Sequence, residues 1–204
     1  MMKNIRIFAI VATFLAATTL TACLGGGKSE PTRYYTLAIE NINMPSAGDA
    51  QNAPRVQIRK FTVEAAYQRN NIVYRESAYD FMFYDLDLWA SRPDNMLTQL
   101  VTEYVNQSGL FKPAEAKPTI KPDYEIVGNV NAIEEVDEGT NRYVHLALSL
   151  TFRKVDDANA LWEGRFDEKI SMNGSEPHHV AEAASKLLAK YMERALGEIA
   201  SAIK

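Results

Sequence analysis

The chain has 204 residues, of which 47% are hydrophobic and 24% charged, and its formal net charge is −4 at neutral pH. This balance is typical of a globular protein and excludes an intrinsically disordered chain. The basic residues form no cluster, which argues against a nucleic-acid partner, because phosphate binding requires grouped Lys and Arg side chains. The single cysteine, Cys23, excludes an intramolecular disulfide and a cysteine-ligated structural zinc site.

The first 22 residues have the features of an export signal. Lys3 and Arg6 form a short positive segment, and residues 7–20 are apolar or small and uncharged. This run is shorter than the roughly 20 residues of a membrane-spanning helix and suits the apolar part of a signal peptide. It leads into residues 20–23 (Leu-Thr-Ala-Cys), which have the aliphatic, small, small, cysteine pattern of a bacterial lipobox.

The lipobox predicts that residues 1–22 form a lipoprotein signal peptide and that Cys23 receives acyl chains such as palmitate. A single acyl chain gives only reversible binding, whereas the two or three chains of a mature bacterial lipoprotein hold it on the membrane. Leu24 rather than Asp follows the cysteine. By similarity to lipoprotein sorting in Gram-negative envelopes, this favours the outer membrane, with the protein facing the periplasm. Residues 23–32 are interpreted as the lipidated cysteine and a flexible, glycine-containing tether.

The exported domain, residues 33–204, opens with strands. Residues 33–39 are rich in strand-forming side chains, and residues 43–54 are polar and contain Pro and Gly, which indicates a loop. Alternating apolar side chains predict a half-buried strand over residues 55–63.

Two more strands are expected before the first helix. Residues 72–75 form a short apolar run, and residues 79–88 are apolar on both faces at their start. The second segment fits either a central strand or an edge strand with an apolar outer face.

A helix follows, with Ser91 as its expected N-cap and Pro93 in its first turn. Gly109 is the expected left-handed cap at its C-terminal end. One apolar stripe is predicted to face the core, and it consists of Met96, Leu97, Leu100, Val101, Tyr104 and Val105.

Three strands over residues 124–136, 143–155 and 161–172 are separated by turn-forming residues and predict an antiparallel meander. An alanine-rich helix then runs from near Pro177 almost to the C-terminus. The expected core face of the middle strand carries Val144, Leu146, Leu148, Leu150 and Phe152. Together these elements predict a single α+β domain, with a mixed or antiparallel sheet and two long helices packed on one or both of its faces.

The sequence contains no recognisable catalytic or metal-binding motif. HExxH and GxSxG are absent, and the only cysteine is committed to lipid. His145, His178 and His179 are interpreted as solvated or capping side chains. Asp85 and Asp87 are interpreted as solvated charges rather than an acid pair or a calcium site. We therefore predict a protein without enzymatic activity, cofactor or metal.

An aromatic segment is the candidate interaction site. Tyr79, Phe81 and Phe83 are expected on one face of an extended strand. Core packing would explain this set, and so would a protein interface, where aromatic side chains and Arg are enriched. Both interpretations stay open, and the candidate interface residues are Tyr74, Arg75, Tyr79, Phe83, Tyr84 and Trp89.

Three stretches of the exported domain resemble a known family. The first is residues 34–37 (YYTL), and the second combines residues 73–77 (VYRES) and the following aromatic residues with a helix that closes in residues 108–111 (SGLF). The third is the meander with its alanine-rich final helix. These features resemble the ABC-type transport auxiliary lipoproteins of the paraquat-inducible protein C type.

This resemblance implies a non-enzymatic role at the outer membrane. Such proteins are partners of MCE-type transport systems, in which an inner-membrane ABC transporter is paired with an MCE-domain protein that bridges the periplasm. These systems move phospholipids or other hydrophobic molecules between membranes. The chain would dock the far end of the bridge, with several copies forming a ring. The alternatives are an envelope assembly or structural lipoprotein, and a solitary lipoprotein that binds lipid or a small ligand in a pocket.

Overall fold

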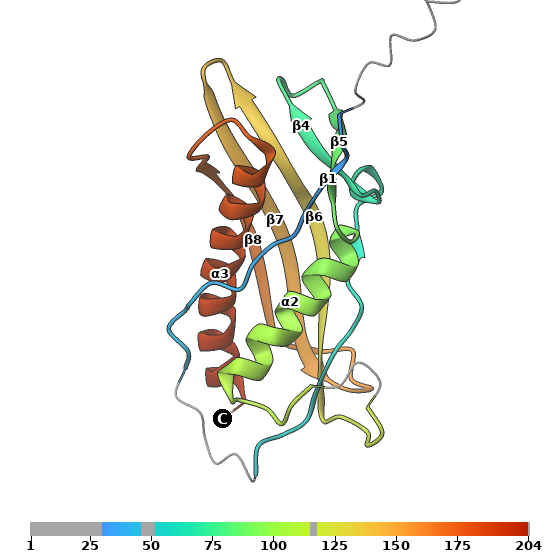
Figure 1. Ribbon diagram of the computed structural model, residues 1–204. Coiled ribbons are helices and arrows are strands. Elements are labelled where there is room, and N and C mark those ends of the chain that lie inside the picture. Colours follow the sequence, from blue (N-terminus) through green and yellow to red (C-terminus); the bar gives the residue numbers. More distant parts are fainter. Residues whose placement is uncertain (1–29, 46–51, 115–117, 204) are drawn as a thin grey trace, which may run out of the picture. The chain divides into compact units, whose positions relative to one another are not determined.

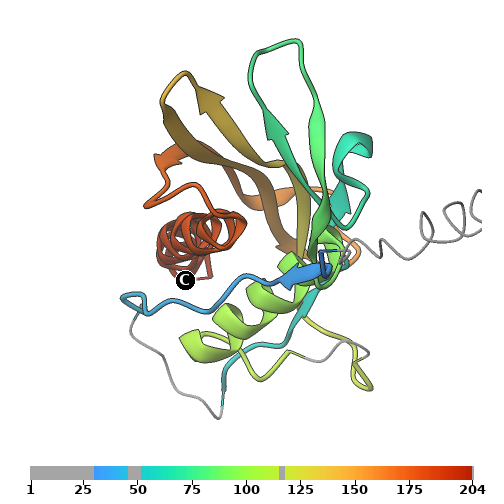
Figure 2. The same ribbon diagram turned by 45° about the horizontal axis from the view of Figure 1, so that its top comes forward.

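A mixed sheet of eight strands, with two helices on one of its faces, makes up this α+β fold (Figures 1 and 2). The structure is a computed structural model that describes residues 30–45, 52–114 and 118–203. The predicted signal peptide and Cys23 lie outside these residues. Within the described ranges, no helix is both long and apolar enough to cross a membrane.

Six of the strands lie side by side in the order β1-β5-β4-β6-β7-β8, and the short strands β2 and β3 pair in parallel with β6. The parallel pairs β1–β5 and β4–β6 make the sheet mixed. The strands are β1 Arg33–Tyr35, β2 Val56–Ile58, β3 Thr62–Val63, β4 Asn71–Arg75, β5 Met82–Trp89, β6 Tyr124–Glu138, β7 Asn141–Lys154 and β8 Ala160–Ser171.

The predicted antiparallel meander is confirmed in β6, β7 and β8. The turn between β6 and β7 contains Gly139 in a left-handed conformation, with φ of 67°, which glycine adopts without a steric penalty. The predicted core face of β7 is confirmed as well, because all five of its apolar side chains are buried. Burial of alternate side chains on one face is what fixes the register of such a sheet.

Helices α2 (Pro93–Ser108) and α3 (Pro177–Ala202) cover the same face of the sheet, as Figure 2 shows. The predicted stripe of α2 faces the core, with only Leu100 partly exposed, and Gly109 forms the predicted left-handed cap with φ of 64°. The N-cap is Arg92 and not Ser91. Pro93 explains the difference, because a proline keeps the residue before it extended and itself suits the first helical position.

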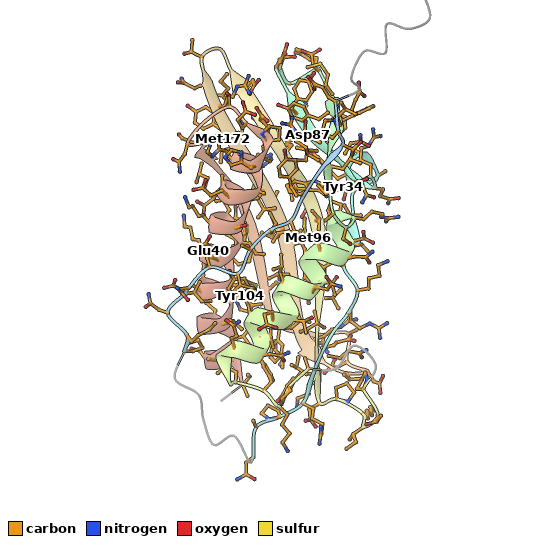
Figure 3. The ribbon with its side chains drawn as sticks, in the orientation of Figure 1. Tyr34, Glu40, Asp87, Met96, Tyr104 and Met172 are labelled. Atoms are coloured by element: carbon orange, nitrogen blue, oxygen red, sulfur yellow. The ribbon has the colours of Figure 1, made fainter. Side chains whose placement is uncertain are left out.

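The sequence predicts a strand over residues 33–39, but β1 ends at Tyr35. The segment after it crosses the helix layer (Figure 1). Its Ala38 N–H donates to Ser185 Oγ of α3, and its Glu40 N–H donates to Tyr104 Oη of α2, each at 2.9 Å (Figure 3). The backbone leaves the sheet after Tyr35 because helix side chains, not a neighbouring strand, supply its hydrogen bonds.

The predicted strand over residues 55–63 is divided into β2 and β3. Between them, the Phe61 N–H donates to Thr98 Oγ1 of α2 at 3.0 Å. The Phe61 ring packs directly on Gly128 of β6, where a Cβ atom would clash with it. A ring inserted over the glycine therefore anchors this segment where the strand pairing is interrupted.

Candidate docking surface

The hairpin that joins β4 to β5 carries most of the candidate interface residues. Tyr79 lies in its loop and is 97% exposed, whereas Phe81 and Phe83 are 36% and 43% exposed. The predicted strand over residues 79–88 begins only at Met82, so Tyr79 and Phe81 do not share a strand face with Phe83. We call Tyr79, Phe81 and Phe83 the hairpin surface.

Hydrogen bonds within the loop hold Tyr79 in place. Ser77 Oγ donates to Asp80 Oδ2 at 2.6 Å and accepts the Tyr79 N–H at 3.1 Å. The Arg75 guanidinium donates to the carbonyls of Ala78 and Asp80. Arg75 is thus a support of the loop, and a loop ordered in advance lowers the entropy cost of binding a partner.

The two phenylalanines of the hairpin surface rest on side chains that precede β4. Phe81 packs edge-on against Tyr67 of the short 3-10 helix η1 (Ala65–Tyr67), with 5.6 Å between ring centroids. The Arg69 guanidinium lies 4.5 Å from the Phe83 ring centroid. Both phenylalanines therefore have a supporting contact and remain partly accessible to solvent.

The other candidate interface residues are less accessible. Tyr74 and Tyr84 are partly buried, and their rings lie 4.8 Å apart. Trp89 is 1% exposed and belongs to the core, so its proposed role at an interface does not fit the structure. It lies at the end of β5, opposite Tyr35 of β1.

Asp87 is not the solvated charge that the sequence suggested. Its carboxylate is buried and accepts hydrogen bonds from Arg33 Nε at 2.7 Å, Arg33 Nη2 at 3.1 Å and Tyr35 Oη at 2.9 Å. These bonds fasten β1 to β5, near the exposed Tyr34 (Figure 3). Asp85 is exposed, as predicted.

A buried carboxylate and histidine pair lies on the face of the sheet that the helices leave open. Glu134 accepts from Tyr67 Oη at 2.6 Å and faces His145 Nδ1 at 3.0 Å, while His145 Nε2 lies 2.7 Å from Asp167 Oδ1. The hydrogen bond to Glu134 raises the pKa of His145. Burial opposes ionisation of Glu134, but the bonds from His145 and Tyr67 outweigh it and lower its pKa.

The sequence predicts that His145 is a solvated or capping side chain. The structure shows instead that it is bonded between Glu134 and Asp167. Only the strand register, which places Glu134 opposite His145, brings these groups together. His178 and His179 lie at the start of α3, as predicted, and His179 Nδ1 lies 3.2 Å from Glu182 Oε2.

Glu135 is fully buried on the face that the helices cover. It accepts from Tyr84 Oη at 3.0 Å and from Arg142 Nη1 at 3.1 Å, and the same arginine nitrogen donates to the Ser175 carbonyl at 3.0 Å. Burial raises the pKa of Glu135 to about 7. Neither this group nor the Glu134 pair follows from a sequence motif. Among the described residues, no group of three or more His, Cys, Asp and Glu side chains is placed to hold a metal ion.

Several solved structures share this fold. Protein XCC0632 from Xanthomonas campestris is 16% identical with a TM-score of 0.73, and the match covers 84% of this chain and 96% of that one. An uncharacterized protein is also 16% identical, with a TM-score of 0.63 and coverage of 86% and 100%. The hypothetical protein CT253 from Chlamydia trachomatis is 7% identical with a TM-score of 0.50, and the match covers 74% and 98%. At these identities the likeness shows the fold alone.

No curated protein matches the sequence. A family model described as the ABC-type transport auxiliary lipoprotein component matches residues 35–195. The matched range contains the hairpin surface, the meander, α2 and most of α3. The chain therefore belongs to the ABC-type transport auxiliary lipoprotein family, whose members are membrane-anchored proteins of the cell envelope.

Proposed function

We propose that this protein is an outer-membrane lipoprotein, anchored through Cys23 and facing the periplasm, that docks with an MCE-type ABC transport system. In this role it assists the transfer of phospholipid or another hydrophobic molecule between the membranes. Family membership supports the association with an ABC transporter. Docking requires no catalytic residue or cofactor, and several copies would form a ring around the end of the MCE-domain protein.

The hairpin surface carries this proposal. Tyr79 is almost fully exposed on a loop that its own hydrogen bonds hold in place. An ordered and exposed tyrosine is typical of residues that contribute strongly to protein–protein binding, because it buries a large area with little loss of side-chain freedom. Phe81 and Phe83 extend the apolar area beside it. We infer that the MCE-domain partner contacts this surface.

Two hollows of the described surface bear on the alternative of a solitary ligand-binding role. One of about 370 Å³ lies beside the hairpin and is lined by charged groups that include Arg75, Glu134, His145 and Lys169. Another of about 290 Å³ lies beside α2 and is lined largely by polar side chains such as Thr98 and Gln99. Pockets for hydrophobic molecules have few charged or polar groups in their linings. Both of these hollows are lined by several such groups, which favours docking over a solitary role in binding lipid.

In vivo crosslinking tests the docking proposal. A photo-crosslinking residue at Tyr79 is expected to capture an MCE-domain protein, identified by mass spectrometry. The matched control is Thr140, which is exposed in the turn between β6 and β7 and lies outside the hairpin surface. Capture at Tyr79 and not at Thr140 would support the proposal. Absence of any MCE-domain protein at Tyr79, Phe81 and Phe83 would contradict it.

The anchor is tested separately. A Cys23→Ala variant is expected to lose the acyl label and to leave the membrane fraction, because the acyl chains hold the protein there. Retention of both the label and the membrane association would show that the lipobox interpretation is wrong.

A further inference from the structure

The outer edge of β8 is a long strand edge that no other described strand covers. β8 is the last strand in the sheet order and has 12 residues. All of its described strand partners belong to β7. It contains no proline, which would block further pairing. A long edge of this kind is a template for another strand.

The exposed face of β8 has a charge pattern that complements itself. Every second residue from Glu163 to Lys169 is exposed, in the order Glu163, Arg165, Asp167, Lys169. If two copies pair in antiparallel fashion with Phe166 opposite Phe166, Glu163 of each copy faces Lys169 of the other. Arg165 then faces Asp167. All four cross-strand pairs join opposite charges, and such pairs stabilise an antiparallel sheet.

The same charges oppose the neighbouring registers. A pairing centred on Arg165 would place Arg165 opposite itself and Glu163 opposite Asp167. A pairing centred on Asp167 would place Asp167 opposite itself and Arg165 opposite Lys169. Like charges directly opposite each other are destabilising, so the pattern selects the register centred on Phe166 over both of these.

The opposite face of β8 supports that register independently. Trp162 and Ile170 are partly buried, apolar and equally distant from Phe166 along the strand. In the register centred on Phe166, Trp162 of each copy faces Ile170 of the other. The pairing would therefore cover two apolar side chains on each copy that the single chain leaves partly exposed.

We propose that β8 binds β8 of a second copy of this chain, forming one continuous sheet with a two-fold axis at Phe166. This contact goes beyond the proposed docking function. The hairpin surface lies toward the other edge of the sheet, so both contacts fit at once. Each chain has one β8 edge, so the contact closes into a pair, and a ring would need a second, different interface.

Cysteine pairing tests the register directly. Two differently tagged full-length chains are co-expressed, one with Glu163→Cys and the other with Lys169→Cys. Directly opposite residues lie about 5 Å apart, whereas the two copies of residue 163 are separated by six residues along the strand, or about 20 Å. We expect a disulfide between the two tagged chains and none when either variant is expressed alone. The unsubstituted chain controls for Cys23.

Charge reversal provides the second readout. Glu163→Lys alone and Lys169→Glu alone are each expected to weaken the association of the detergent-solubilised protein about tenfold, as measured by analytical ultracentrifugation. The double variant Glu163→Lys/Lys169→Glu restores the opposite pairs and should recover the original affinity. Absence of the mixed disulfide, equal disulfide formation by one variant alone, or no recovery in the double variant would each overturn the proposal.

Discussion

The meander with α3 and the β4–β5 hairpin are stabilised in different ways. The meander buries apolar faces against an alanine-rich helix, and its strands are 12 to 15 residues long. The strands at the hairpin end are shorter, with 5 residues in β4 and 8 in β5, and polar bonds such as those of Asp87 hold them. The first region is a framework, and the second carries exposed aromatic side chains.

If the hairpin surface docks a partner as proposed, stability and binding depend on separate residues. Apolar burial contributes most of the folding free energy of a domain, and here it is concentrated in the sheet and the helices. Exposed aromatic side chains contribute little to folding but much to association. Substitutions in the two regions should therefore affect different measurements.

The largest effect on folding is expected for Phe152→Ala. Phe152 is fully buried, and its ring stacks 4.9 Å from Tyr124 and lies 5.9 Å from Phe111. Removing it should lower the free energy of unfolding by about 3–5 kcal/mol in denaturant titration, because it leaves a cavity. Tyr79→Ala is the control and should change the stability by less than about 0.5 kcal/mol. Equal losses in the two variants would remove the distinction between the regions.

Asp87→Ala should have a smaller effect on the hairpin end. The change removes three hydrogen bonds from Arg33 and Tyr35, and we expect a loss of about 1–3 kcal/mol in thermal or denaturant unfolding. Asp85→Ala, an exposed change in the same strand, should cost less than about 0.5 kcal/mol. If the two variants have the same stability, the bonds of Asp87 do not hold β1 to β5.

Glu135 lies where the two regions meet, and it should make the stability of the fold depend on pH. Its pKa is about 7 in the folded protein, against 4.5 for an ordinary glutamate. Between these values the folded state holds a proton that the unfolded state has released, so stability falls as pH rises from about 4.5 to 7. Glu135→Gln cannot titrate and should reduce this fall by about 1–3 kcal/mol.

Urea titrations at pH 5 and pH 8 measure that difference, with the exposed Glu103→Gln as the control. The raised pKa of His145 contributes with the same sign, because stability from a protonated histidine is lost as pH rises through its folded pKa. The Glu135→Gln variant should therefore keep part of the fall in stability between pH 5 and pH 8. An unchanged slope in this variant would contradict the assignment to Glu135.

The regular parts of the fold could be predicted from the sequence because their signals are local. The spacing of Val144 to Phe152 and the left-handed cap at Gly109 both depend on residues close in the chain. The polar contacts could not be predicted in this way. Asp87 meets Arg33 across 54 residues, and Glu134 meets Tyr67 across 67. Such pairs depend on strand order, which no local pattern encodes.

The candidate site was predicted in part for the same reason. Composition identifies the aromatic segment, but periodicity places Tyr79 on a strand, and the aromatic character of Trp89 makes it a candidate interface residue. The loop conformation depends on Arg75 and Ser77, and the burial of Trp89 depends on the pairing of β1 with β5. Exposure of individual aromatic side chains therefore required the tertiary structure.

The most direct test of the docking role is the affinity of the protein for the periplasmic part of the proposed MCE-domain partner. Tyr79→Ala and the control Thr140→Ala would be compared with the unsubstituted protein by calorimetry, with unfolding curves recorded for each. We expect Tyr79→Ala to weaken binding at least tenfold, the usual effect of truncating a central aromatic contact, with unchanged stability, and Thr140→Ala to bind normally. Equal affinity of all three proteins would contradict docking through the hairpin surface.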